Sequence, residues 1–278
     1  MDAQQLVLPT PDGRSLAVTR WPSSGPAVVL LHAGVADRRS WSAVADLLQG
    51  DDLDLVAPDR RGSGDSEPGA GPSTATHVDD LLVVLDALAL ERVLLVGNST
   101  GGALALDAAL LHPERVSGVV LLGAAVSGMT DDDTPFDWQP DAVTEELDRR
   151  ADDVTATTAE RVRALAHLWL DGPTSEEGRV GGDARALFEA MNRRILELAA
   201  PEPAGDSRTD AWTRLGEVAV PVLCAWGDLD LPCDAPFYEE TARRLGQGPA
   251  RILPGVAHLP GLERPDLVAE LVREALAR

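Results

Sequence analysis

Residues 97–101 have the types and spacing of a site for nucleophilic catalysis. They read Gly-Asn-Ser-Thr-Gly and lie between an apolar run at 93–97 and a stretch of helical periodicity at 100–111. A Gly-x-Ser-x-Gly sequence in that setting predicts a sharp strand-to-helix turn that exposes the serine at the helix N-terminus. Backbone amides and the helix dipole favour developing negative charge there. Ser99 is therefore the candidate nucleophile, and a Cβ at Gly97 or Gly101 should collide with the turn.

A serine nucleophile needs a general base, and the useful candidates among the side chains are five histidines. His258 follows a short apolar run at 250–253, on a loop where it can reach a neighbouring serine. The other four fit structural roles better: His112 caps a helix before Pro113, His77 and His167 pack or face solvent on helices, and His32 organises the loop that follows a strand. His258 is therefore the candidate base.

The acid that orients the base should follow a neighbouring strand. Asp228 and Asp230 both lie directly after the apolar run at 220–226. The residues alone do not decide which of the two is the acid, because either can instead serve only to turn the loop.

The elements that must position these residues follow an alternating pattern. Short apolar runs bounded by Gly, Pro and Asp predict strands buried on both faces, whereas 15–21 alternates and predicts a half-exposed edge strand. Helical periodicity occurs between the runs, and together they indicate an α/β fold with a mostly parallel sheet flanked by helices. The expected strands are 27–32, 53–58, 93–97, 116–122, 220–226 and 250–253, and the expected helices are 39–49, 74–89, 100–111 and 265–277.

The alternation is interrupted between residues 127 and 216. That stretch contains no strand candidate and predicts helices near 142–150, 159–170 and 183–199. We expect a core at 1–126 and 217–278 and an all-helical cap at 127–216, lying over the carboxyl edge of the sheet, where open parallel sheets bind ligands. Aromatic and apolar cap residues are candidate pocket walls, although packing is the more frequent role of such residues: Phe136, Trp138, Trp169, Leu170, Phe188, Met191 and Trp212.

Composition excludes several classes of function. The chain has 46 acidic and 24 basic residues, a net charge of -22, and no lysine. A Schiff base, a pyridoxal phosphate anchor and the lysine of a phosphate-binding loop are thereby excluded, and an acidic surface disfavours nucleic acid and anionic membranes. Two cysteines, no signal peptide and no membrane-spanning run predict a cytoplasmic protein. We further expect a monomer or homodimer that acts on a small molecule and uses no cofactor or metal.

Collectively, these motifs resemble those of the α/β-hydrolase superfamily. The matches are the His-x-Gly loop at 32–34, the Asp-x-Arg-Gly-x-Gly-x-Ser turn at 59–66, the Gly-x-Ser-x-Gly turn, Gly-x-x-Asp at 227–230 and Gly-x-x-His at 255–258. The resemblance implies a triad of Ser99, Asp230 and His258, which selects Asp230 over Asp228. It also implies an oxyanion hole made by the backbone N–H groups of Gly34 and Thr100.

The same resemblance narrows the chemistry. Serine at the turn argues against haloalkane dehalogenases and epoxide hydrolases of this fold, which use aspartate there. We expect hydrolysis of a carboxylic ester, lactone or related acyl bond of a small, largely apolar molecule, with Ala33, Trp138 and Trp169 as candidate substrate contacts. Three alternatives stay open: a carbon–carbon bond hydrolase, a non-hydrolytic lyase, dehydratase or cyclase of secondary metabolism, and a receptor that uses the pocket only for recognition.

Overall fold

The computed structural model describes residues 2–67, 74–129, 135–136, 138–198 and 209–278. Within these residues, eight strands form one sheet at the centre of the protein. The strand order is β1-β2-β4-β3-β5-β6-β7-β8. Strand bounds are β1 Gln4–Pro9, β2 Ser15–Trp21, β3 Ala27–Leu31, β4 Asp54–Pro58, β5 Val93–Asn98, β6 Val116–Leu122, β7 Val222–Gly227 and β8 Arg251–Leu253.

In this order, every pair of neighbouring strands from β4 to β8 is parallel. The two pairs that β2 forms, with β1 and with β4, are antiparallel. Strands β4 and β5 are buried along their whole length, as continuous apolar runs require when helices cover both faces. The expected mostly parallel sheet is therefore confirmed, and the strand 116–122 has the predicted bounds.

The prediction of an edge strand at 15–21 is wrong. β2 lies between β1 and β4, and most of its residues are buried. The edge is instead β1, which the sequence patterns did not predict. Only three consecutive residues of β1 are apolar, and they alternate, with Leu6 and Leu8 partly buried and Val7 at 71% exposure. This run is shorter than the continuous apolar runs of the other predicted strands.

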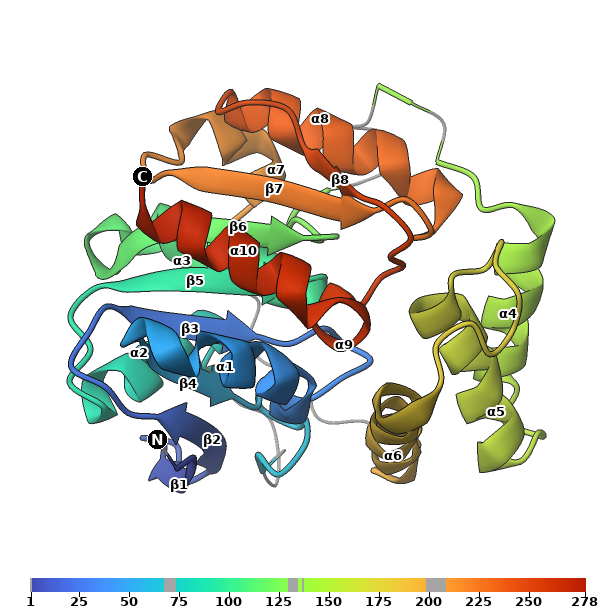
Figure 1. Cartoon of the computed structure of the whole chain (residues 1–278), viewed down its shortest axis with the longest axis horizontal. Helices are drawn as coiled ribbons and strands as arrows, with labels where there is room; N and C mark the ends of the chain where they lie inside the picture. Colours follow the sequence, from blue (N-terminus) through green and yellow to red (C-terminus); the bar gives the residue numbers. More distant parts are fainter. Residues whose placement is uncertain (1, 68–73, 130–134, 137, 199–208) are drawn as a thin grey trace.

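Helices cover both faces of the sheet. One hydrophobic cluster joins the sheet to α1 and α10, which lie in front of it in Figure 1, and a second joins the other face to α2, α3, α7 and α8. Their bounds are α1 Ser42–Leu48, α2 His77–Ala87, α3 Thr100–Leu111, α7 Ala211–Arg214, α8 Ala235–Leu245 and α10 Pro265–Leu276. α3 has the predicted bounds because Ser99 opens it and His112-Pro113 ends it.

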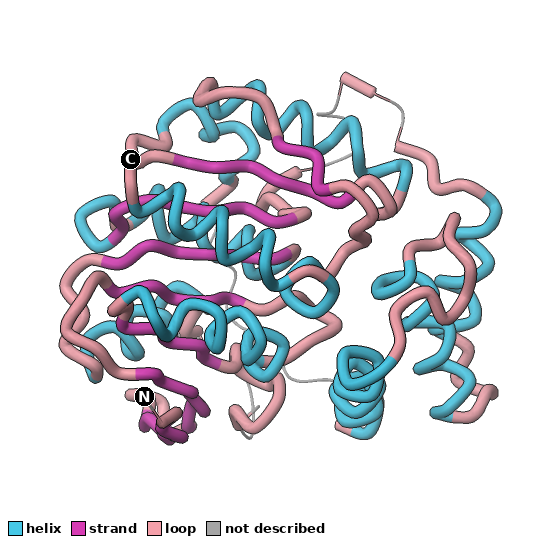
Figure 2. The backbone as a smooth tube through the Cα atoms, in the orientation of Figure 1, coloured by secondary structure: helices cyan, strands magenta, loops and turns pink. Residues whose placement is uncertain are grey.

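The chain between β6 and β7 forms helices where the sequence predicts them. They are α4 Ala142–Asp152, α5 Thr158–Leu165 with the π-helix Ala166–Asp171, and α6 Gly182–Glu197. Figure 1 shows α4, α5 and α6 beyond the sheet, on the side toward which the arrowheads of its parallel strands point, and Figure 2 shows the same helices in cyan, apart from the magenta strands. The loops that follow β3, β5, β7 and β8 emerge on that same side.

Candidate active site

Ser99 sits in a strained turn between β5 and α3. Its φ of 54° and ψ of -121° lie where L-residues are uncommon, and the next residue, Thr100, begins the helix. A Cβ on Gly97 would lie 2.4 Å from the Gly101 carbonyl oxygen, and one on Gly101 would lie 2.2 Å from the Leu31 carbonyl oxygen. Both glycines are therefore required by close backbone approach, as the sequence predicts.

His258 and Asp230 form a buried pair beside this turn. Nδ1 of His258 lies 2.9 and 3.0 Å from the two carboxylate oxygens of Asp230, and the two residues are 4% and 3% exposed. Because Nδ1–H donates to the carboxylate, Nε2 is the ring atom left to accept a proton. Burial lowers the pKa of His258, but the charge and hydrogen bond of Asp230 raise it, and the net shift is upward.

Asp228 occupies a different place from Asp230. Its Oδ1 accepts a hydrogen bond of 2.6 Å from the N–H of Gly255, at the start of the loop that carries His258. The structure thus brings Asp230, and not Asp228, to the imidazole. Asp228 joins two loops, which is the turn-forming role that the residues alone left open.

A second carboxylate lies beside Asp230. The Tyr238 hydroxyl is 3.0 Å from Asp230 Oδ2 and 3.4 Å from Asp234 Oδ2. Asp234 Oδ1 accepts a 2.7 Å hydrogen bond from the indole N–H of Trp138. Burial and then the nearby Asp230 charge raise the pKa of Asp234. The sequence did not single out Asp234 or Tyr238, because only the fold shows that these side chains lie beside Asp230.

Two further side chains hold the loop of His258. Asn98 Nδ2 donates to the carbonyl oxygens of Leu122 and His258, at 2.8 and 2.9 Å. Glu263 accepts from the N–H groups of Ala257 and Leu259, the residues on either side of His258. Asn98 could have been suspected from its place in Gly-Asn-Ser, whereas nothing in the sequence marks Glu263.

The residues expected to form the oxyanion hole are neighbours. A Cβ on Gly34 would lie 3.7 Å from Thr100 Oγ1, so the loop after β3 reaches the start of α3. His32, at the beginning of that loop, accepts a 3.0 Å hydrogen bond from the Arg60 N–H at Nε2, and its Nδ1 is 2.7 Å from the Ala33 carbonyl oxygen. His32 therefore organises this loop, as expected.

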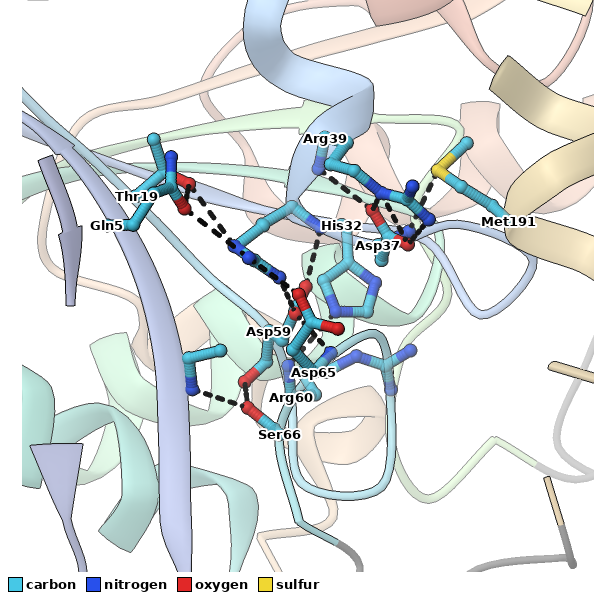
Figure 3. Close-up of polar contacts among 12 residues, drawn as sticks. Gln5, Thr19, His32, Asp37, Arg39, Asp59, Arg60, Asp65, Ser66 and Met191 are labelled. Carbon is cyan, nitrogen blue, oxygen red and sulfur yellow. Dashed lines mark hydrogen bonds and ion pairs between the residues drawn. The ribbon is translucent and has the colours of Figure 1, made fainter. Parts of the chain in front are cut away.

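The 59–66 turn braces the same region (Figure 3). The carboxylate of Asp59 accepts hydrogen bonds from the N–H groups of Arg38 and Asp65, at 2.7 and 2.8 Å. Ser66 Oγ donates to the Asp59 carbonyl oxygen and accepts from the Ala17 N–H. This motif is structural: it ties the loop after β4 to β2 and to the segment that follows the oxyanion loop.

A cavity of about 200 Å³ opens beside Ser99 and His258. Trp138 and Trp169 line it, and the Trp169 ring lies 4.6 Å from the His258 ring, centroid to centroid. Ala33 does not line it but is buried at 1% exposure in a hydrophobic cluster with Leu170, Phe188 and Met191. Of the other candidate walls, Trp212 stacks on Phe237 in the core, and Phe136 lines a separate surface hollow beside α8.

The remaining histidines lie outside this cavity. His167 Nε2 is 3.0 Å from the Ser175 carbonyl oxygen, His112 faces Glu114 at 3.5 Å, and His77 begins α2. Within the described residues, no group of three or more His, Cys, Asp or Glu side chains has the arrangement of a metal site. None of the helices in the described part of the chain is long and apolar enough to cross a membrane.

Comparison with known proteins identifies relatives. The family model for the alpha/beta hydrolase fold matches residues 26–231. A putative 2-succinyl-6-hydroxy-2,4-cyclohexadiene-1-carboxylate synthase of Bacillus subtilis is 29% identical over 274 residues, 95% of this chain and 96% of that protein. A 2-hydroxymuconate semialdehyde hydrolase of Pseudomonas putida is 39% identical over 101 residues, 36% of each chain. The structure of a thermophilic esterase from Thermogutta terrifontis superposes with a TM-score of 0.70 at 25% identity, covering 99% and 98% of the two chains.

Proposed function

Because this chain belongs to the α/β-hydrolase family, we propose that it is a serine hydrolase acting on a carboxylic ester, lactone or related acyl bond of a small molecule. One observation carries the proposal. His258, held by the buried carboxylate of Asp230, lines the same cavity as Ser99, which stands on a strained turn at the N-terminus of α3. A histidine oriented by a carboxylate on the same cavity as a serine supports activation of that serine as a nucleophile.

In the proposed acylation step, Nε2 of His258 removes the proton of Ser99 Oγ, which attacks the substrate carbonyl carbon. The N–H groups of Gly34 and Thr100 would stabilise the resulting oxyanion, a contribution of about 3 to 4 kcal/mol per donor in related enzymes. Asp230 holds the imidazole in the productive tautomer and stabilises its charged form. The leaving group takes the proton from His258 and departs.

In the proposed deacylation step, His258 removes a proton from a water molecule, which attacks the ester carbonyl of the acylated Ser99. Collapse of the second tetrahedral intermediate releases the acid and returns the proton to Ser99. Trp169 packs against the His258 ring, so it limits the orientations that the imidazole adopts during the two proton transfers.

The esterase from Thermogutta terrifontis supports ester hydrolysis, and the Bacillus relative supports a second candidate, a non-hydrolytic reaction on the same scaffold. The compound in the name of that relative carries a carboxylate group. No arginine is among the residues that line the described cavity, which instead presents the carboxylate of Asp234. A substrate with its own carboxylate at this position would be repelled, and for this reason we favour the hydrolase.

Fluorophosphonate labelling tests the proposal. The wild type should be labelled at Ser99, the Ser99→Ala variant should not, and the wild type should hydrolyse activated esters such as p-nitrophenyl acetate. A folded wild type that resists labelling would overturn the nucleophile. Labelling without hydrolysis of a broad ester and lactone panel would favour a carbon–carbon hydrolase, a non-hydrolytic enzyme or a receptor. A cytoplasmic location and a monomeric or homodimeric state stay predictions of the sequence.

A further inference from the structure

The cavity beside Ser99 is unusually aromatic for this chain. The whole sequence has six Trp, three Phe and one Tyr, and four of these residues line this one cavity: Trp138, Trp169, Phe237 and Tyr238. Trp138 and Trp169 come from the segment between β6 and β7, whereas Phe237 and Tyr238 come from α8. The walls therefore combine aromatic groups from two parts of the fold.

A carboxylate that forms no ion pair with an arginine stands among these rings. Asp234 lines the cavity, and no ion pair between it and an arginine occurs among the described residues. Its hydrogen-bond donors are neutral: the Trp138 indole N–H at 2.7 Å, the Tyr238 hydroxyl at 3.4 Å and the Cys233 thiol at 3.8 Å. The single hydroxyl proton of Tyr238 lies nearer to Asp230, at 3.0 Å, so Asp234 Oδ2 retains capacity to accept another hydrogen bond.

Aromatic rings and a carboxylate around one small cavity are the groups that recognise an alkylammonium ion. The rings attract the cation through their quadrupoles, and the carboxylate supplies the opposite charge. The net charge of -22 also raises the local concentration of cations around the protein. A carboxylate or phosphate would meet Asp234 unfavourably, and a purely apolar group would leave its charge half-buried without compensation.

We propose that the Asp234 side of this cavity binds an alkylammonium group, so that the substrate of Ser99 is an acyl compound carrying a positively charged amine. That the bound compound is a substrate rests on the proposed hydrolase function. The ammonium-binding site itself rests only on Asp234 and the surrounding aromatic rings. Asp234 is then a specificity-determining residue, distinct from the acid Asp230.

A purely structural role for Asp234, as the anchor of Trp138, is the alternative. Asp234→Asn separates the two, because the amide oxygen can still accept from the indole N–H while the negative charge is gone. Asp228→Asn is the matched control: it removes one carboxylate from the same loop, and Asp228 bonds Gly255 and does not line the cavity.

Binding is measured in the Ser99→Ala background by titration calorimetry with choline and with 3,3-dimethylbutan-1-ol, its neutral isostere. Choline should bind about tenfold more tightly or better, and adding Asp234→Asn should abolish this preference while Asp228→Asn preserves it. Equal binding of the two probes, or a preference that survives Asp234→Asn in a folded protein, would overturn the proposal.

Turnover gives an independent measure in the wild-type background. The ratio of kcat/KM for acetylthiocholine over 3,3-dimethylbutyl thioacetate should exceed about ten, and Asp234→Asn should lower it toward one. Because Asp234 also raises the pKa of His258, Asp234→Asn changes the rate with both esters, and the ratio cancels this shared effect. A ratio near one in the wild type would contradict the ammonium site as part of the substrate pocket. If no ester is hydrolysed while choline binding behaves as expected, the proposed function fails and the ammonium site stands.

Discussion

The side-chain amide of Asn98 donates a 2.9 Å hydrogen bond to the backbone carbonyl of His258. The residue immediately before the candidate nucleophile therefore holds the loop that carries the candidate base. This contact fixes the two partners of the proton transfer relative to each other, although 160 residues separate Asn98 from His258 in the chain.

Asn98→Ala should impair catalysis beyond its effect on stability. The substitution leaves the buried His258 carbonyl without its hydrogen-bond donor, which should lower the free energy of unfolding by about 1 to 3 kcal/mol. It also releases the loop that carries His258, so kcat should fall about tenfold or more. Urea unfolding and ester hydrolysis per folded molecule check this. Gln247→Ala, which loses an amide that donates to the Val220 carbonyl oxygen away from the site, should keep its kcat.

Asp230→Asn should lower kcat by about 10³- to 10⁴-fold, because the amide no longer stabilises the charged imidazole and favours the wrong tautomer. Asp228→Asn should cost less than about tenfold, since Asp228 only receives the Gly255 N–H. Initial rates with an activated ester distinguish the two variants. A large loss in Asp228→Asn with none in Asp230→Asn would reverse the assignment of the acid.

Gly123→Ala should lower activity by displacing the acid. Gly123 has φ +47°, and an added Cβ would lie 3.0 Å from Asp230 Oδ2 and 3.5 Å from His258 Nδ1. Gly246→Ala provides the control, because Gly246 has φ +68° with open space around its Cβ position. Both variants should lose about 1 to 2 kcal/mol of stability from left-handed strain, and only Gly123→Ala should lose kcat at equal folded fraction.

The rate of hydrolysis should rise with pH through the titration of His258. Only the neutral imidazole accepts the Ser99 proton, and the Asp230 carboxylate raises its pKa, so the midpoint for kcat/KM should lie above the ordinary 6.5. The Asp234 charge contributes to the same increase, so Asp234→Asn should move the midpoint to lower pH. A shift to higher pH in that variant would contradict the sign of this interaction.

Protein stability should fall with decreasing pH because of His32. Burial, and secondarily the charge of Arg60, lower its pKa to about 3. Below pH 6.5, His32 is protonated in the unfolded chain, whereas in the native protein it stays neutral down to about pH 3. His32 therefore lowers the free energy of unfolding by about 1.4 kcal/mol for each pH unit across that window. Unfolding free energies of wild type and His32→Gln between pH 7 and 4 should therefore converge as pH falls. A constant difference would show that His32 does not contribute.

Local sequence patterns were enough to predict the nucleophile turn and the continuous apolar strands. Glycines at 97 and 101 and an apolar run before Ser99 leave few other conformations, because backbone sterics and the burial of continuous apolar runs act over short distances. The same local reasoning missed β1, whose short Leu-Val-Leu run alternates between partly buried and exposed residues.

Which groups meet in the site depends on the packing of elements that lie far apart in the chain. Asp228 and Asp230 are alike in the sequence, but in the turn after β7 Asp228 bonds to Gly255 and Asp230 bonds to His258. Asp234, Tyr238 and Glu263 join the site through the packing of α8 and of the segment after His258. Such contacts depend on where separate elements pack in space. The side-chain types along one stretch of chain do not reveal how close that stretch lies to another.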